Sequence, residues 1–174
     1  CCERYGEAGV AMIHRLIARA HRHGIEVILV ARRGDVGISA QHYAAAAFDP
    51  GPDACGGSAA DWLTINSYLG EDGIAPFLRA GHGAFALVRT SNPDGDVIQN
   101  LELKDGRTVS HAVAELISRI GSQHIGTRGY SSLGAVVGAT KREDAATLRS
   151  LMPQQMLLVP GYGAQGGGLG GDPV

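Results

Sequence analysis

Short runs of apolar residues recur along the chain, separated by longer segments in which apolar and polar positions are mixed. The runs are rich in Val, Ile and Leu and do not alternate strictly with polar residues, a pattern typical of strands buried on both faces of a sheet. This pattern predicts five strands, at 25–30, 62–66, 84–89, 133–138 and 156–160.

The segments between these runs place apolar residues at the spacing of amphipathic helices. Helices are predicted at 40–47, 74–80, 109–120 and 144–151. A further amphipathic helix is expected at 10–22, with one apolar stripe formed by Val10, Ile13, Ile17 and Ala20. No strand precedes this helix, so we expect part of the fold to lie upstream of the first residue.

Strands that alternate with helices predict an α/β protein with a parallel sheet covered by helices. An open doubly wound sheet binds its ligand at one crevice, whereas a TIM (β/α)8 barrel gathers the carboxyl ends of all its strands around one site. Polar or glycine-rich residues follow all five predicted strands, which favours the barrel. The chain is therefore expected to be an incomplete barrel, with about five of the eight βα units. Residues 1–174 are expected to form a single partial barrel domain, with 166–174 as a flexible tail.

Composition narrows the range of functions. The 174 residues are 44% hydrophobic and carry a formal net charge of -2, which argues against a protein that binds nucleic acid or a membrane surface. No apolar run is long enough to span a membrane, and the three cysteines form no disulfide or metal-binding pattern, so a cytoplasmic location is expected. The seven histidines form no ligand set, and no metal site is predicted.

Two polar segments that follow strands contain candidate site residues. Glycines flank Asp35 in the segment 32–40, although an ordinary turn with solvated arginines explains that segment about equally well. In the segment 90–95, Ser91 and Asn92 could hydrogen-bond the edge of a ligand, but turns commonly contain such residues.

The segment 159–167 is the most informative one. An apolar strand leads directly into Pro160 and Gly161, and glycines then surround Gln165 and continue through Gly166. Successive backbone N–H groups in such a loop can form an anion-binding nest, and phosphate sites recur late in parallel barrels. A glycine-rich connector without a ligand is the alternative interpretation.

Taken in order, these segments resemble the longer bacterial subtype of the orotidine 5'-monophosphate decarboxylase family. The resemblance rests on ArgArgGlyAspValGly (32–37), ThrIleAsnSerTyrLeuGly (64–70), LeuValArgThrSerAsnPro (87–93), ValValGlyAlaThr (136–140) and ProGlyTyrGlyAlaGlnGlyGly (160–167). It implies an eight-stranded barrel that acts as a homodimer. It also implies conversion of orotidine 5'-monophosphate to UMP and CO2 in de novo pyrimidine biosynthesis, without a cofactor.

The resemblance also implies roles for individual residues. Asp35 matches a catalytic aspartate that reaches the site of the partner subunit. Ser91 matches the serine that contacts the pyrimidine edge, and Thr140 falls near a second pyrimidine contact. The phosphate would be held by the loop that contains Pro160, Gly161, Gln165 and Gly166.

Two substitutions depart from the family pattern. Where the family has Asp-X-Lys, this chain has Val30, Ala31 and Arg32. Val30 has no carboxylate, and the guanidinium of Arg32 keeps a positive charge but is a poor proton donor because its pKa lies above about 12. The resemblance therefore predicts a catalytic position at Arg32 with impaired decarboxylation. Three further family residues, an Asp, a Lys and a phosphate-binding Arg, would lie before Cys1 or after Val174.

Two other functions remain open from the sequence. The first is a non-catalytic barrel that binds UMP or phosphate through Ser91 and the glycine-rich loop. The second is a barrel enzyme for another phosphorylated substrate, with Arg32 holding a second anionic group.

Overall fold

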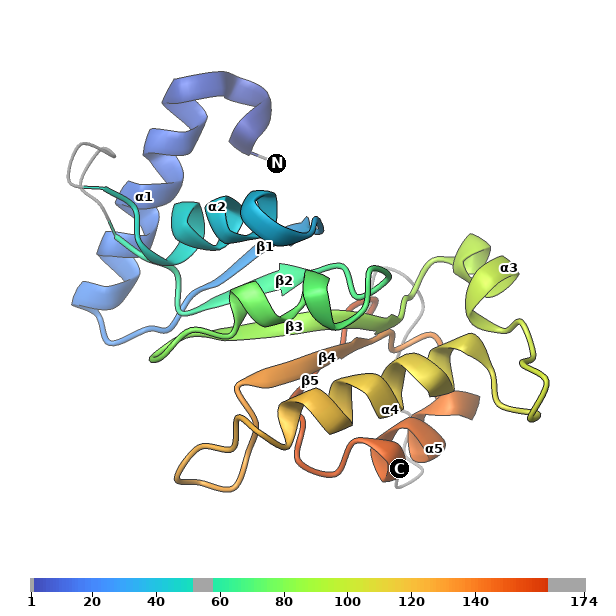
Figure 1. The fold of residues 1–174 in the computed structure, drawn as a ribbon. Coiled ribbons are helices and arrows are strands. Elements are labelled where there is room, and N and C mark those ends of the chain that lie inside the picture. The colour runs from blue at the N-terminus through green and yellow to red at the C-terminus, as the bar shows by residue number, and fades with distance from the viewer. Residues whose placement is uncertain (1, 52–57, 163–174) are drawn as a thin grey trace.

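The computed structural model describes residues 2–51 and 58–162, which form a parallel five-stranded sheet with helices packed against it (Figure 1). The strands pair in chain order, β1-β2-β3-β4-β5, and every pairing is parallel. Their bounds are β1 Ile28–Arg33, β2 Trp62–Ile65, β3 Gly83–Arg89, β4 Leu133–Val137 and β5 Leu157–Leu158.

Helices, and two 3-10 turns between β2 and β3, connect the strands and lie outside the sheet (Figure 1). A 3-10 turn, Cys2–Tyr5, precedes the first helix, and the short α3 lies beyond the carboxyl end of β3 (Figure 1). The helices are α1 Gly6–Arg22, α2 Gly37–Phe48, α3 Asp96–Gln99, α4 Val109–Gly121 and α5 Arg142–Leu151. Helix α2 packs against β1, α4 packs against β3 and β4, and α5 packs against α4. Thr108 caps α4: its hydroxyl accepts from the His111 N–H, and the His111 ring accepts from the Thr108 N–H.

The hydrophobic core lies between one face of the sheet and the helices. Alternate strand residues point into it, because successive side chains of a strand lie on opposite faces. The sheet contributes Leu63, Ile65, Ala84, Ala86, Val88, Leu133, Ala135 and Val137, and the helices contribute Ala44, Phe48, Ile117 and Leu148 among others.

The opposite face of the sheet carries the intervening residues. The Trp62 and Phe85 rings lie 4.9 Å apart on this face. A Cβ at Gly83 would come within 2.2 Å of the Trp62 ring, and one at Gly134 within 2.6 Å of the Phe85 ring. Glycine at these two positions therefore makes room for the aromatic side chains of the neighbouring strands.

Sequential strand order distinguishes the two architectures that the sequence left open. A doubly wound sheet reverses its strand order at a switch point, whereas the strands of a barrel follow one another in sequence. The observed order shows no reversal within the described residues. The barrel prediction is confirmed, with five parallel strands in the described residues.

The first strand begins and ends three residues later than predicted. Ile25 lies in the turn after α1, where its N–H donates to the Ala20 carbonyl at 3.1 Å. At the other end, Arg32 and Arg33 belong to the strand, although two adjacent arginines suggested a loop.

The predicted helix at 74–80 is wrong. Two 3-10 turns, Glu71–Gly73 and Ala75–Phe77, occupy this region, and Pro76 lies inside the second. Ile74 and Phe77 are both fully buried. Their three-residue spacing fits a 3-10 turn as well as an α-helix, so the apolar pattern did not distinguish the two.

The helix predicted at 10–22 forms the larger part of α1. Of its expected stripe, Ile17 is buried, Ile13 and Ala20 are half-buried, and Val10 is exposed. Within the described part of the chain, no helix is both long and apolar enough to cross a membrane.

Candidate functional site

A cavity of about 830 Å³ lies at the carboxyl end of the sheet. Its wall is formed by residues of β1, by the loops after β3 and β4, and by Pro160, which follows β5. The lining residues are Arg32, Leu87, Thr90, Ser91, Asn92, Pro93, Asp96, Val136, Thr140, Lys141 and Pro160. Ligand sites of parallel barrels lie at this end of the sheet.

A backbone irregularity in β1 accompanies the placement of Arg32. Leu29 pairs with Leu63 and Arg33 with Ile65, so four residues of β1 span the length of two on β2. The Thr64 hydroxyl accepts from the N–H groups of Ala31 and Arg32, both at 3.0 Å. Bulges of this kind redirect side chains, and Arg32 lines the cavity.

Arg32 has a left-handed backbone conformation, with φ of 48°. All other described residues with positive φ are glycines. This conformation costs a non-glycine residue about 1–2 kcal/mol. Strain of this kind concentrates at functional sites, which favours a ligand-binding role for the Arg32 position.

The loops after β3 and β4 pack closely against each other beside the cavity. The Thr140 hydroxyl donates to the Ser91 carbonyl at 2.9 Å, and the Gly138 N–H donates to the Arg89 carbonyl at 2.7 Å. A Cβ at Gly138 would lie 2.7 Å from both Cα and N of Ser91. Glycine at 138 therefore permits the close approach that fixes the position of Ser91.

Replacing Gly138 with Ala is expected to destabilise the chain by about 1–3 kcal/mol, because the added methyl group meets backbone atoms that cannot rotate away. Urea denaturation followed by circular dichroism measures this change. Gly126→Ala is the matched control, since a Cβ there would meet the Tyr130 carbonyl at an ordinary 3.5 Å. Equal unfolding midpoints for the two variants would show that the β4 loop can move without cost.

Two charged residues of the cavity were not predicted from the sequence. The Lys141 ammonium lies 2.6 Å from the Asp96 carboxylate, and both line the cavity. Hydrogen bonds from Lys141 and Arg89 lower the pKa of Asp96 below its ordinary value, so this side chain is ionised at neutral pH. The position of Lys141 directly after Thr140, in the polar segment that follows β4, was the signal that could have found it.

The charge balance of the cavity favours an anionic ligand. Arg32 and Lys141 both line it, and Asp96 is the one carboxylate among the described residues that line it. That carboxylate already accepts from Lys141 and from Arg89 at 2.5 Å. Arg32 therefore contributes a positive charge that can bind a carboxylate or phosphate group of a ligand.

The structure brings together four of the predicted site residues: Arg32, Ser91, Thr140 and Pro160 all line the same cavity. Asp35 is not among the lining residues, and its carboxylate accepts from the Val36 N–H at 2.8 Å.

The rest of the glycine-rich segment lies at or beyond the end of the described chain. Gly161, with φ of 90°, follows Pro160 without lining the cavity. Gln165, Gly166 and the predicted tail 166–174 lie outside the described residues.

A second cavity, of about 860 Å³, opens at the opposite end of the sheet. Trp62, Gly83 and Ser132, at the amino ends of three strands, contribute to it. We assign the ligand site to the carboxyl-end cavity despite the similar volumes, because barrel ligands bind at that end. No group of three metal-ligating side chains occurs at residues 2–51 or 58–162.

The sequential parallel sheet defines part of a (β/α)8-barrel protein, and the charges that line the cavity at its carboxyl ends favour an anionic ligand. The sequence matches the family described as Orotidine 5'-phosphate decarboxylase / HUMPS over residues 1–173, and the chain belongs to this family. Membership agrees with the resemblance seen in the sequence motifs.

Individual relatives are similar over nearly the whole chain. An orotidine 5'-phosphate decarboxylase of Rhodopirellula baltica is 40% identical over 95% of this chain and 56% of that protein. One of Herpetosiphon aurantiacus is 44% identical over 95% of this chain and 57% of that protein. The structure of Leishmania donovani OMP decarboxylase matches with a TM-score of 0.78 and 34% identity, over 92% of this chain and 59% of that one. The chain thus spans a little over half the length of these relatives.

Proposed function

We propose that the protein to which this chain belongs binds orotidine 5'-monophosphate and converts it to UMP and CO2, a step of pyrimidine biosynthesis. Family membership over residues 1–173 supports this function. The single observation that supports a site for this function is the cavity at the strand ends, which Arg32, Ser91, Thr140 and Pro160 line together. An anionic nucleotide fits the charge of this cavity.

In this proposal each candidate residue has a distinct role. Ser91 binds the pyrimidine edge, and Thr140 supports it through the hydrogen bond to the Ser91 carbonyl. The loop containing Pro160, Gly161, Gln165 and Gly166 binds the phosphate through its backbone N–H groups. Asp35 does not line this cavity, and in this proposal it instead reaches the site of a partner subunit in a homodimer.

We place the protein in the cytoplasm and treat residues 1–174 as one part of a single barrel domain. Decarboxylation in this proposal uses side chains alone, without a metal or an organic cofactor. The carbanion formed when CO2 leaves has to be stabilised by a positive charge and then protonated.

Arg32 and Val30 limit this chemistry. A guanidinium beside the ring supplies the positive charge, but it holds its proton too tightly to act as a general acid near neutral pH. Val30 supplies no carboxylate to orient the cation. We therefore expect the chain as it stands to bind the nucleotide and to decarboxylate it poorly.

The same two substitutions favour a second candidate function, a barrel that binds UMP without turnover. In this case the cavity keeps Ser91 and Thr140, while the catalytic pair has been lost. A third candidate, turnover of another phosphorylated substrate whose second anionic group binds Arg32, also fits the positive charge of the cavity.

Calorimetric titration of UMP, together with an absorbance assay for loss of orotidine 5'-monophosphate, tests these functions. Ser91→Ala is expected to weaken UMP binding about tenfold, because one hydrogen bond to the ligand contributes about 1 kcal/mol or somewhat more. Ser150→Ala on the exposed side of α5 is the control and should bind like the parent chain.

Each outcome separates the candidates. Binding with slow turnover supports the decarboxylase, and binding without turnover supports the non-catalytic barrel. Turnover of a different phosphorylated compound supports the third function. Failure of the parent chain to bind UMP, or unchanged binding by Ser91→Ala, contradicts the assignment of the pyrimidine site.

A further inference from the structure

A cluster of four charged side chains lies beside the cavity, where β3, α3 and α5 meet, and two of them, Asp96 and Lys141, line it. Arg89, the last residue of β3, donates through Nε to Asp144 at 2.6 Å and through an Nη atom to Asp96 at 2.5 Å. Lys141 donates to the same Asp96 oxygen at 2.6 Å. The side chains of Arg89 and Lys141 are almost completely buried, with 1% and 8% exposure.

Asp96 occupies the central position in this cluster. Of the two acids, Asp144 is bonded to Arg89, whereas Asp96 accepts from both Arg89 and Lys141. Buried cations require such partners, because an unpaired charge in a protein interior carries a large desolvation cost. Asp96 thus links two buried cations, Arg89 at the end of β3 and Lys141 in the loop after β4, and shares the charge of Arg89 with Asp144.

The cluster extends directly to the residues before Ser91. Gln99 lies on the same short helix as Asp96, and its side-chain oxygen Oε1 accepts from the Thr90 N–H at 2.9 Å and from the Arg89 guanidinium at 3.3 Å. The Gln99 amide donates to the Thr90 hydroxyl at 2.7 Å. Helix α3 therefore fixes both the side chain of Arg89 and the backbone of Thr90, immediately before Ser91.

On the other side, the cluster fixes the loop after β4. Lys141 follows Thr140, whose hydroxyl donates to the Ser91 carbonyl. The Lys141 N–H donates to the Gly138 carbonyl at 3.1 Å, and the Gly138 N–H donates to the backbone carbonyl of Arg89. Both loops that line the cavity are thus linked to one carboxylate.

We propose that Asp96 is a positioning residue of the site: by binding Arg89 and Lys141 together, it holds the β3 loop with Ser91 and the β4 loop with Thr140 at a fixed separation. Asp96 acts through these two cations and needs no contact of its own with the ligand. The effect on nucleotide binding rests on the proposed function, whereas the effect on the two loops does not.

Hydrogen–deuterium exchange of the chain without ligand tests the proposal. In Asp96→Asn, we expect the amides of Thr90 and Gly138 to exchange at least about tenfold faster, because local opening frees the backbone groups that the cluster restrains. The amides of β2 should be unchanged. Lys141→Met should speed exchange at Gly138 alone, because it removes only one of the two links to Asp96.

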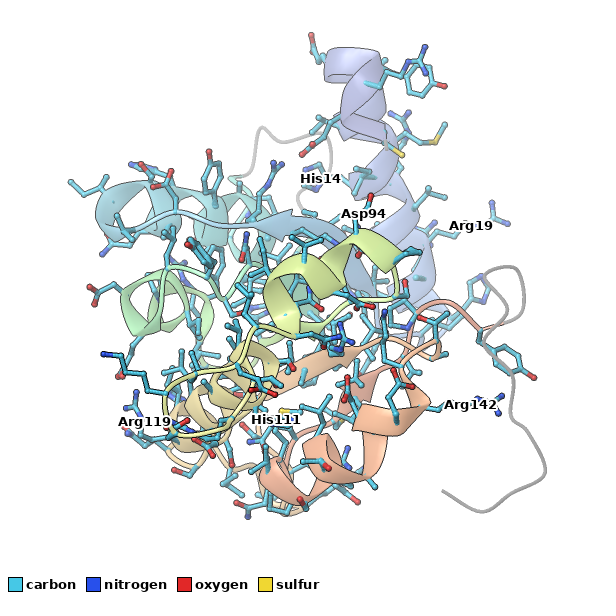
Figure 2. The ribbon with its side chains drawn as sticks, turned by 90° about the vertical axis from the view of Figure 1, so that its right-hand side faces the viewer. His14, Arg19, Asp94, His111, Arg119 and Arg142 are labelled. Atoms are coloured by element: carbon cyan, nitrogen blue, oxygen red, sulfur yellow. The ribbon has the colours of Figure 1, made fainter. Side chains whose placement is uncertain are left out.

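Asp94→Asn is the matched control. Asp94 lies two residues before Asp96 in the 3-10 turn Pro93–Gly95, on the same short helical segment (Figure 2), and its side chain is exposed. Asp94→Asn removes the same charge close to the site without touching Arg89 or Lys141, so exchange should match the parent chain.

UMP titration adds a second readout. The dissociation constant of Asp96→Asn should rise about tenfold or more, since small displacements of binding groups cost of this order, and Asp96→Glu should recover part of the loss. Unchanged exchange in Asp96→Asn, equal acceleration in Asp94→Asn, or uniform acceleration that includes β2 would each overturn the proposal. If the parent chain binds no UMP, the proposed function fails while the exchange result still decides the role of Asp96.

Discussion

Changing Val30 to Asp and Arg32 to Lys together is expected to raise the rate of orotidine 5'-monophosphate decarboxylation by at least about 100-fold, the lower end of what a positioned general acid contributes. A Lys ammonium combines the positive charge with a proton that it can donate, and a neighbouring carboxylate orients it. Arg32 already lines the cavity at the bulge of β1, so the new Lys would start from the same backbone position.

The reaction is best measured in a longer chain, because residues 1–174 span only part of the family's length. In one suitable chimera, this chain replaces the matching segment of the Rhodopirellula baltica relative, of which it covers 56%. Absorbance at the pyrimidine band follows loss of the substrate, and UMP titration confirms that each variant still binds.

Arg33→Lys is the matched control for the double change. Arg33 lies one residue further along β1, where it pairs with Glu3 and its guanidinium lies 5.3 Å from the Tyr43 ring centre. A lysine there is expected to leave turnover unchanged. If Arg33→Lys recovers activity and the double variant does not, the alignment of Val30 and Arg32 with the family pair is wrong by one residue.

The apolar pattern was sufficient to predict all five strands, although it placed β1 three residues too early. Strands such as β3 and β4 are continuous apolar segments buried on both faces, so hydrophobicity alone marks them. Alternation with helices then implied parallel pairing, and the polar strand ends implied a barrel. These features depend on local composition, which a sequence displays directly.

The bulge in β1 could not be predicted in the same way. It depends on Thr64, whose hydroxyl binds two backbone N–H groups of the neighbouring strand. Two arginines in succession also resemble the beginning of a loop, although both lie in β1. A contact between residues more than thirty positions apart leaves no periodic signal in the sequence.

The ion cluster around Arg89 escaped prediction for a related reason. Arg89 appeared only as part of a family motif, and Asp96, Lys141 and Asp144 are separated from it by 7 to 55 positions. An arginine at the end of an apolar run is usually expected to reach solvent. Its burial becomes understandable only when the folded chain places two carboxylates against it.

Removing this buried cation should have a large effect on stability. Arg89→Met keeps much of the side-chain volume but leaves the Asp144 carboxylate without its arginine, and the free energy of unfolding is expected to fall by about 3 kcal/mol. Burial alone would lower the pKa of Arg89, but hydrogen bonds to Asp144 and Asp96 raise it above its ordinary value, so the side chain is fully charged at neutral pH. Urea denaturation followed by circular dichroism gives the free-energy difference.

Arg119→Met is the control that shows how much of the loss in Arg89→Met comes from the burial of the ion pair. Arg119 projects from the outer side of α4 (Figure 2) and pairs with Glu71 at 3.1 Å, with 61% and 50% of the two side chains exposed. An exposed pair of this kind contributes less than about 1 kcal/mol. Arg89→Lys should fall between the two, because lysine keeps the charge but cannot bind Asp96 and Asp144 with one planar group. If Arg89→Met and Arg119→Met lose similar amounts of unfolding free energy, the buried pairs of Arg89 contribute no more than the exposed pair of Arg119. The cluster would then not hold β3 to α3 and α5.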